Sequence, residues 1–124
     1  MLLDSTGVRS IRLTCSMPGM SNVAPLSLLS AVVVLDSSLD GWSLLEPSAE
    51  GRRSFRKLVS FDTAFGAPPV VHVGVVGLDV SKDDNLRLSV RADSITAADF
   101  TLSVETWLNT KIWSVEVSWL AIGS

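Results

Sequence analysis

Two segments in the last third of the chain alternate between apolar and polar residues, and a short polar turn joins them. Their apolar positions are Phe100, Leu102 and Val104, then Trp113, Val115, Val117, Trp119 and Ala121. Because successive side chains of a strand point to opposite faces, each segment has one apolar and one polar face. With Asn109-Thr110 at the bend, the pattern predicts a β-hairpin lying on a core. Trp107 falls on the polar parity next to this turn, so its indole needs a reason other than core packing.

Further short strands are expected along the rest of the chain, separated by turn signals such as Asp40-Gly41 and Pro68-Pro69. The expected strands are 31–35, a short one at 42–45, 56–61, 70–78 and 86–92. The segment Val70–Leu78 is apolar on both parities, which predicts a central strand covered on both faces. Because no segment has a convincing helical period, and turns recur about every ten residues, the chain is expected to be an all-β antiparallel sandwich.

The segment 86–92 has the clearest alternation outside the last third. Its expected inward positions are Leu86, Leu88, Val90 and Ala92, and its expected outward positions are Arg87, Ser89 and Arg91. Two arginines therefore lie on the solvent side of one predicted strand.

Composition excludes several classes of function. The 124 residues suffice for one domain with its own core, and 47% of them are hydrophobic. A net charge of −3 gives no electrostatic case for nucleic acid, and no apolar run is long enough to predict membrane insertion. Cys15 is the only cysteine, so no intrachain disulfide is possible, and His72 is the only histidine, within an apolar run where we expect a packed or hydrogen-bonded residue. No catalytic residues, cofactor or metal site are therefore expected.

The acidic residues Asp79, Asp83 and Asp84 lack the spacing and the turn glycine of a calcium loop. They are expected to form a solvated turn.

The first 24 residues have little periodicity and are expected to form a tail or arm, either disordered or lying on a partner subunit. The run Leu26–Leu35, with Arg9 and Arg12 upstream, imitates a signal peptide, but no small-x-small cleavage site follows it. A first core strand is the favoured interpretation, so the sandwich domain is expected over residues 25–124. The route of export stays open.

Residues 56–123 resemble the H-type lectin domain, the family of the snail agglutinins and of the C-terminal domain of the discoidins. The matching residues are Phe61, Pro68-Pro69-Val70-Val71, Leu78-Asp79, Asn85-Leu86-Arg87, Phe100, Thr106-Trp107, Asn109-Thr110-Lys111 and Ser118-Trp119. A weaker match begins near Ala31 and includes Trp42, while residues 1–24 lie outside the resemblance.

The resemblance implies a six-stranded antiparallel β-sandwich that assembles into a homotrimer. It implies calcium-independent binding of galactose-type sugars, notably N-acetylgalactosamine, at sites between subunits. It also implies a location outside the cell or on the surface of a cell or particle.

The resemblance further assigns candidate carbohydrate-binding residues. The arginine that bonds the sugar matches Arg87, the hairpin aromatic matches Trp107, and a further aromatic matches Trp113, where the snail protein has tyrosine. An acidic sugar-binding residue falls at Glu50 in place of aspartate. Leu108 replaces a histidine that contacts sugar and can gather a metal, so neither that hydrogen bond nor that metal is expected.

The types of these candidate residues suit a sugar-binding site even if the family resemblance is set aside. A sugar presents an apolar patch of C–H bonds and hydroxyls in fixed directions, which suit an aromatic surface and charged hydrogen-bonding groups. Each candidate also has a plainer interpretation: Arg87 as solvated or paired with Glu105, Trp107 as a subunit contact, Trp113 as core and Glu50 as solvated.

Two functions remain open at this point. The first is a glycan-binding lectin. The alternative is a structural or adhesive trimeric module of a phage-like fibre, spike or other surface assembly, in which residues 1–24 form the attachment arm. An enzyme is not expected, because no nucleophile–base pair or metal cluster is visible.

Overall fold

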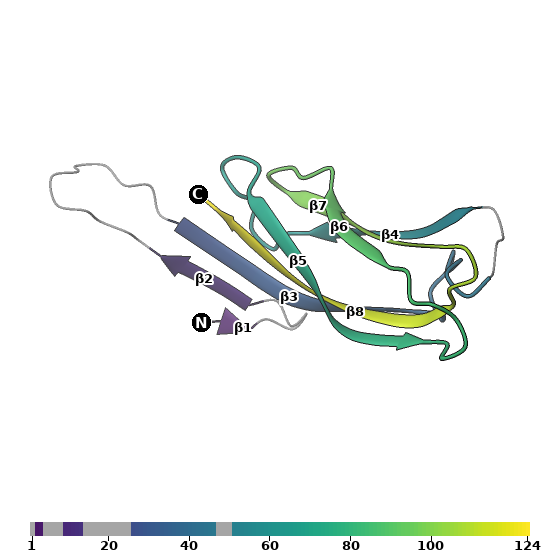
Figure 1. Cartoon of the computed structure of the whole chain (residues 1–124). Helices are drawn as coiled ribbons and strands as arrows, with labels where there is room; N and C mark the ends of the chain where they lie inside the picture. The colour runs from purple at the N-terminus through teal and green to yellow at the C-terminus, as the bar shows by residue number, and fades with distance from the viewer. Residues whose placement is uncertain (1, 4–8, 14–25, 47–50) are drawn as a thin grey trace, which may run out of the picture.

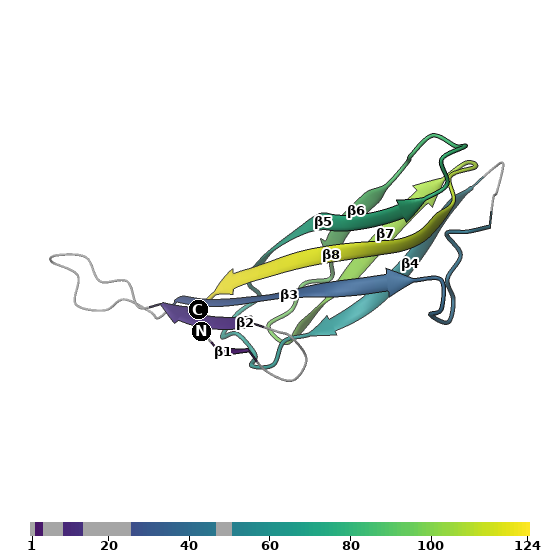
Figure 2. The ribbon, with the colours of Figure 1, turned by 90° about the horizontal axis from the view of Figure 1, so that it is seen from below.

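The computed structural model describes residues 2–3, 9–13, 26–46 and 51–124. They form two antiparallel sheets, which lie one above the other in Figure 1, and Figure 2 shows the larger sheet from its outer side. The strands are β1 (Leu2–Leu3), β2 (Arg9–Leu13), β3 (Leu26–Asp36), β4 (Arg52–Ser60), β5 (Val70–Val80), β6 (Ser89–Asp93), β7 (Asp99–Trp107) and β8 (Ile112–Gly123). The described residues contain no helix, and hence none long and apolar enough to cross a membrane.

The strand order is β1-β2-β3-β8-β5 in the larger sheet and β4-β7-β6 in the smaller one. The predicted all-β antiparallel sandwich is confirmed. Strands β3 to β8 correspond to the six strands that the resemblance implies, and the short strands β1 and β2 extend the larger sheet beyond β3. Both lie within the segment 1–24, whose other residues are outside the described part, so its role as an arm stays a prediction. The trimer also stays a prediction.

The inner faces of the two sheets meet in one apolar core. Trp119 of β8 packs against Phe100 of β7, with ring centroids 5.5 Å apart, and against Phe61, with centroids 5.9 Å apart. All three side chains are buried. Burying a side chain such as phenylalanine contributes about 1.5–3 kcal/mol, so the contact of Trp119 with Phe100 and Phe61 holds the two sheets together.

The predicted hairpin of the last third is wrong in its pairing. Strand β7 pairs with β4 and β6, whereas β8 pairs with β3 and β5. Residues 108–111 therefore carry the chain across the core from one sheet to the other (Figure 1). Alternation shows only that each strand has one apolar face. Two strands paired in one sheet and two strands facing each other across a core both bury such faces, so the pattern does not distinguish the two arrangements.

The prediction that Val70–Leu78 is a central strand covered on both faces is also wrong. Strand β5 is the edge strand next to β8, and it exposes Val70, Val76 and His72. Its register with β8 shifts between Val75 and Gly77, as at a β-bulge. Apolar residues occur on both parities of β5 because the outer face of the larger sheet is itself partly apolar. His72 is exposed on this strand, whereas a packed or hydrogen-bonded histidine was expected.

Three further expectations change in detail. The segment 42–45 forms no strand and belongs to an irregular turn region. Trp42 packs on Phe55 there, and its Nε1 donates to the Ile112 carbonyl at 3.0 Å. Strand β4 begins at Arg52, four residues before the expected start. In the segment 86–92, Leu88, Val90 and Ala92 pack against the core as predicted, but Leu86 precedes β6 and is 53% exposed.

Candidate functional site

A buried arginine holds the connection between β7 and β8. Arg53 lies on the inner side of β4 and is 8% exposed. Its guanidinium donates to the carbonyls of Leu44 at 3.1 Å, Leu108 at 2.8 Å and Thr110 at 2.6 Å. Burial lowers the pKa of Arg53, but an arginine stays charged at neutral pH. These bonds fix the turn, in which Leu108 adopts a φ of 56°.

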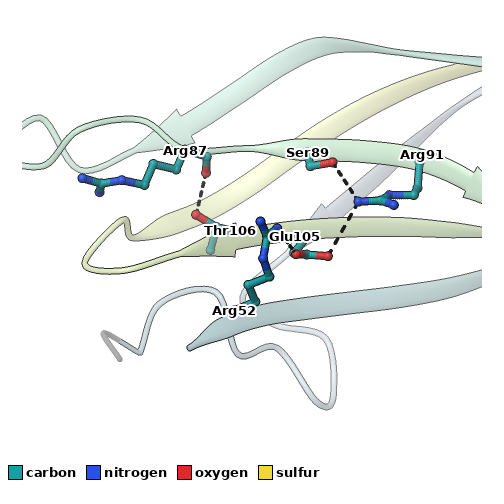
Figure 3. A network of polar contacts seen from close by, with 6 residues as sticks. All are labelled: Arg52, Arg87, Ser89, Arg91, Glu105 and Thr106. Atoms are coloured by element: carbon teal, nitrogen blue, oxygen red, sulfur yellow. Dashed lines mark hydrogen bonds and ion pairs between the residues drawn. The ribbon is translucent and has the colours of Figure 1, made fainter. Parts of the chain in front are cut away.

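Arg87 is oriented by this turn. Its Nη1 donates to Asn109 Oδ1 at 2.9 Å and to Thr110 Oγ1 at 3.1 Å. Its backbone carbonyl accepts from Thr106 Oγ1 at 2.5 Å. In Figure 3 the Arg87 side chain points away from Glu105, so the expected alternative pairing of Arg87 with Glu105 is wrong.

Asp84, which the sequence pattern predicts in a solvated turn, is bonded to the same turn residue as Arg87. Asn109 Nδ2 donates to Asp84 Oδ1 at 3.1 Å, so one amide links Asp84 to Arg87. Only folding brings Asp84 and Asn109 together, because they are separated by 24 residues of chain, and no local signal predicts the contact. Glu50, the acidic candidate of the sequence, lies outside the described residues.

Trp107 ends β7 on the outer face of the smaller sheet, where it is partly exposed. It lies opposite Arg52 in the register with β4, and the Arg52 guanidinium carbon is 4.9 Å from the ring centroid. A cation over an indole face is attracted by about 0.5–1 kcal/mol at an exposed site. One face of Trp107 is therefore covered by Arg52 within the chain.

Glu105 forms the next part of the same face. It is hydrogen-bonded to Arg52 and lies 3.9 Å from Arg91 Nη2, which also donates to Ser89 Oγ at 3.4 Å (Figure 3). The hydrogen bond from Arg52 is the main reason that the pKa of Glu105 lies below its ordinary value.

Trp113 is not part of the core, contrary to the plainer interpretation of its parity. It is 41% exposed, because the register between β5 and β8 skips it: Asp79 lies opposite Ser114 and Val80 opposite Ile112. This irregularity lets Ile112 and Val115 both point inward. Leu108 is exposed in the turn. Within the described part of the chain, no hydrogen bond or ring contact joins Trp113 or the Leu108 side chain to Arg87.

No group of three or more metal-ligating side chains occurs among the described residues. A hollow of about 330 Å³ lies at the opposite end of β8, lined by residues that include Ser27, Phe65 and Ser124. None of the candidate sugar contacts among the described residues borders it; Arg87, Asp84 and Trp107 lie on the surface near the other end of β8.

Residues 56–122 match the H-type lectin domain. Because this match spans more than half of the chain, the chain belongs to the H-type lectin domain family, a non-catalytic family whose domain implies carbohydrate binding. The resemblance seen in the sequence is thereby confirmed.

The chain is also similar to three known proteins and structures. A curated protein of Fuscovulum blasticum, described as ATP synthase subunits region ORF 7, is 36% identical over 77 residues, which span 62% of this chain and 67% of that protein. The native structure of recombinant discoidin II of Dictyostelium discoideum superposes with a TM-score of 0.67 and 22% identity, and that of wild-type discoidin II with 0.66 and 22%. The matches cover 87% and 86% of this chain but only 40% and 39% of discoidin II. This likeness shows the fold.

Proposed function

We propose that the chain is a lectin that binds galactose-type sugars, such as N-acetylgalactosamine, at the end of the sandwich that carries Arg87. The observation that carries the proposal is the link from Asp84 through Asn109 to Arg87. It holds a charged donor and a charged acceptor on the two sides of one amide, at an accessible surface. Neighbouring hydroxyls of one sugar ring need such a pair, since one hydroxyl accepts from the guanidinium while the other donates to the carboxylate.

Trp107 supplies the aromatic surface that the C–H patch of a galactose-type ring requires. Arg52 covers one of its faces, so the sugar stacks on the other face or packs against the edge. Each hydrogen bond to a charged group contributes about 1.5–3 kcal/mol at most, and water competes at an open surface. Binding at a single site is therefore expected to be weak.

Association into a homotrimer completes this proposal. Trp113 and Leu108 are exposed near the same end of the sandwich but reach no candidate contact within their own chain. In a trimer they line the sites of neighbouring subunits, which matches the inter-subunit sites implied by the family. Three weak sites on one particle raise the avidity for a surface that displays many glycans.

The test is a glycan array with the purified protein and two variants. Arg87→Ala removes the oriented guanidinium and is expected to abolish binding. Arg9→Ala removes one positive charge from an exposed position of β2, on the other sheet, and is expected to bind as the unaltered protein does. Unchanged binding by Arg87→Ala would refute the site. A monomer in light scattering would refute its inter-subunit part.

A structural or adhesive module of a surface assembly is the second candidate. The observation that favours it is the exposure of Val32, Val34 and Val70 on the outer face of the larger sheet. Large exposed apolar patches mark contact surfaces. A folded trimer that binds no glycan on the array would support this function in place of the lectin.

A further inference from the structure

One end of the outer face of the smaller sheet concentrates positive charge. The register places Arg56 of β4, Ser103 of β7 and Arg91 of β6 in one row across the sheet. The neighbouring row holds Ser54, Glu105 and Ser89, and Arg52 and Trp107 follow at the end of the strands. Three arginines thus surround one carboxylate, and we call Arg52, Arg56 and Arg91 the arginine face.

Glu105 neutralises only part of this charge. The three arginines and Glu105 sum to a formal charge of +2, although the whole chain carries −3. Asp93 lies opposite Thr101 in the next row of the same outer face, and Asp99 lies beyond it, so the positive charge belongs to the end of the sheet near Glu105. The Glu105 side chain is 16% exposed, whereas those of Arg52 and Arg91 are 65% and 53% exposed. The carboxylate therefore lies low between the arginines, and most of their N–H donors remain directed to solvent.

Ser103 shows how these side chains lie. It points outward between Arg56 and Arg91, yet it is 3% exposed. Long arginine side chains on both sides of a short one account for this burial, since their aliphatic parts lie along the sheet and their heads reach water. Arg56 and Arg91 consequently flank one point on the sheet from opposite strands.

We propose that the arginine face binds the acidic group, a carboxylate or a sulfate, of a glycan whose galactose-type ring lies at Arg87; this inference rests on the proposed function. A planar guanidinium matches the paired oxygens of either group. Arginines held close together repel one another, so an anion between them is favoured electrostatically. Trp107 contacts Arg52, and the preceding residue, Thr106, donates to the Arg87 carbonyl, so Arg87 lies next to the Trp107 end of the arginine face.

The test compares matched pairs of glycans, each galactose-type structure being printed in its neutral, sulfated and carboxylated form. The acidic forms are expected to bind about tenfold more tightly than the neutral form, and added salt should reduce this difference. The double variant Arg56→Ala/Arg91→Ala keeps Arg52 and Trp107 in place. It should bind all forms as weakly as the unaltered protein binds the neutral one. The control Arg9→Ala should keep the full preference.

The outcomes separate this inference from the proposed function. Equal binding of neutral and acidic forms would overturn the arginine face as an anion site and leave the lectin intact. Acidic binding that survives Arg87→Ala would also overturn it, since the acidic group would then act without the sugar site. If no form binds to the folded protein, the lectin itself fails. Circular dichroism of each variant confirms that the sheets are formed.

Discussion

The two sheets share one core but present different outer faces. The smaller sheet carries three arginines and a glutamate at the end where Trp107 lies. The larger sheet exposes valines instead: Val32 is 57% exposed, Val34 53% and Val70 73%. Both sheets follow the same alternation of inward and outward side chains, so the difference lies in which residues occupy the outward positions.

This difference assigns different roles to the two faces. Exposed charged residues are well solvated and suit a ligand that exchanges with water, whereas contiguous exposed apolar residues favour a protein contact. The proposed trimer supplies such a contact, with a second copy of the chain as the partner. The glycan is then expected at the Arg87 end of the smaller sheet. The subunit contact is expected on the larger sheet, where it includes Trp113 of β8 and so brings that residue to the Arg87 end of a neighbouring subunit.

The largest expected effect comes from Arg53→Met, which removes the support of the turn beside the charged face and leaves the apolar face unaltered. Three carbonyls lose a buried charged donor, so the free energy of unfolding should fall by about 2–4 kcal/mol. Urea unfolding measures this change, and glycan binding should be lost with it. A decrease in the free energy of unfolding below about 0.5 kcal/mol would show that the turn is stable without Arg53.

The variant Val32→Ser/Val34→Ser tests the apolar face. Both residues are exposed on β3, so the sandwich should remain folded while a trimer that buries them dissociates at roughly tenfold higher protein concentration. Light scattering over a dilution series measures the association. The control variant is Leu58→Ser/Thr101→Ser, which also places serine at two outward positions, but on the smaller sheet. If the variant remains trimeric over the same dilution series, Val32 and Val34 do not lie in the subunit contact.

The smallest effect is expected from Glu105→Gln on the charged face. The folded-state pKa of Glu105 is depressed, so the ionised carboxylate stabilises the fold above its ordinary pKa of 4.5, and this contribution is lost as the pH falls through the folded-state value. The gain is under about 1 kcal/mol, since the Arg52 partner is exposed. Thermal unfolding of both proteins should differ at pH 7 and converge in acid. A constant difference would contradict the assignment.

Several features could be predicted from the sequence because they are local. The two-residue period located most strands, and it placed Phe100, Val117 and Trp119 in the core. The resemblance carried by the motifs identified the family and drew attention to Arg87. The fold class needed no long-range information, since each strand reveals its own apolar face.

Other features depended on contacts between distant parts of the chain. The exposure of Trp113 follows from one skipped residue in its pairing with β5, which its own alternation does not reveal. Asp84, the acidic residue of the proposed site, is linked to Arg87 only through Asn109, which lies in the connection between β7 and β8. A parity rule assumes an unbroken register, and a bulge reverses it.

The sequence by itself determined that this chain forms an antiparallel sandwich of the H-type lectin family, because side-chain periodicity and family motifs are properties of short segments. Tertiary structure alone decided that β7 and β8 belong to different sheets, that β5 is an edge, and that Arg87 meets Asn109 and Thr110. The physical reason is that alternation sets the direction of each side chain relative to the core. The choice of neighbouring strand depends on backbone hydrogen bonds with segments far away in the chain.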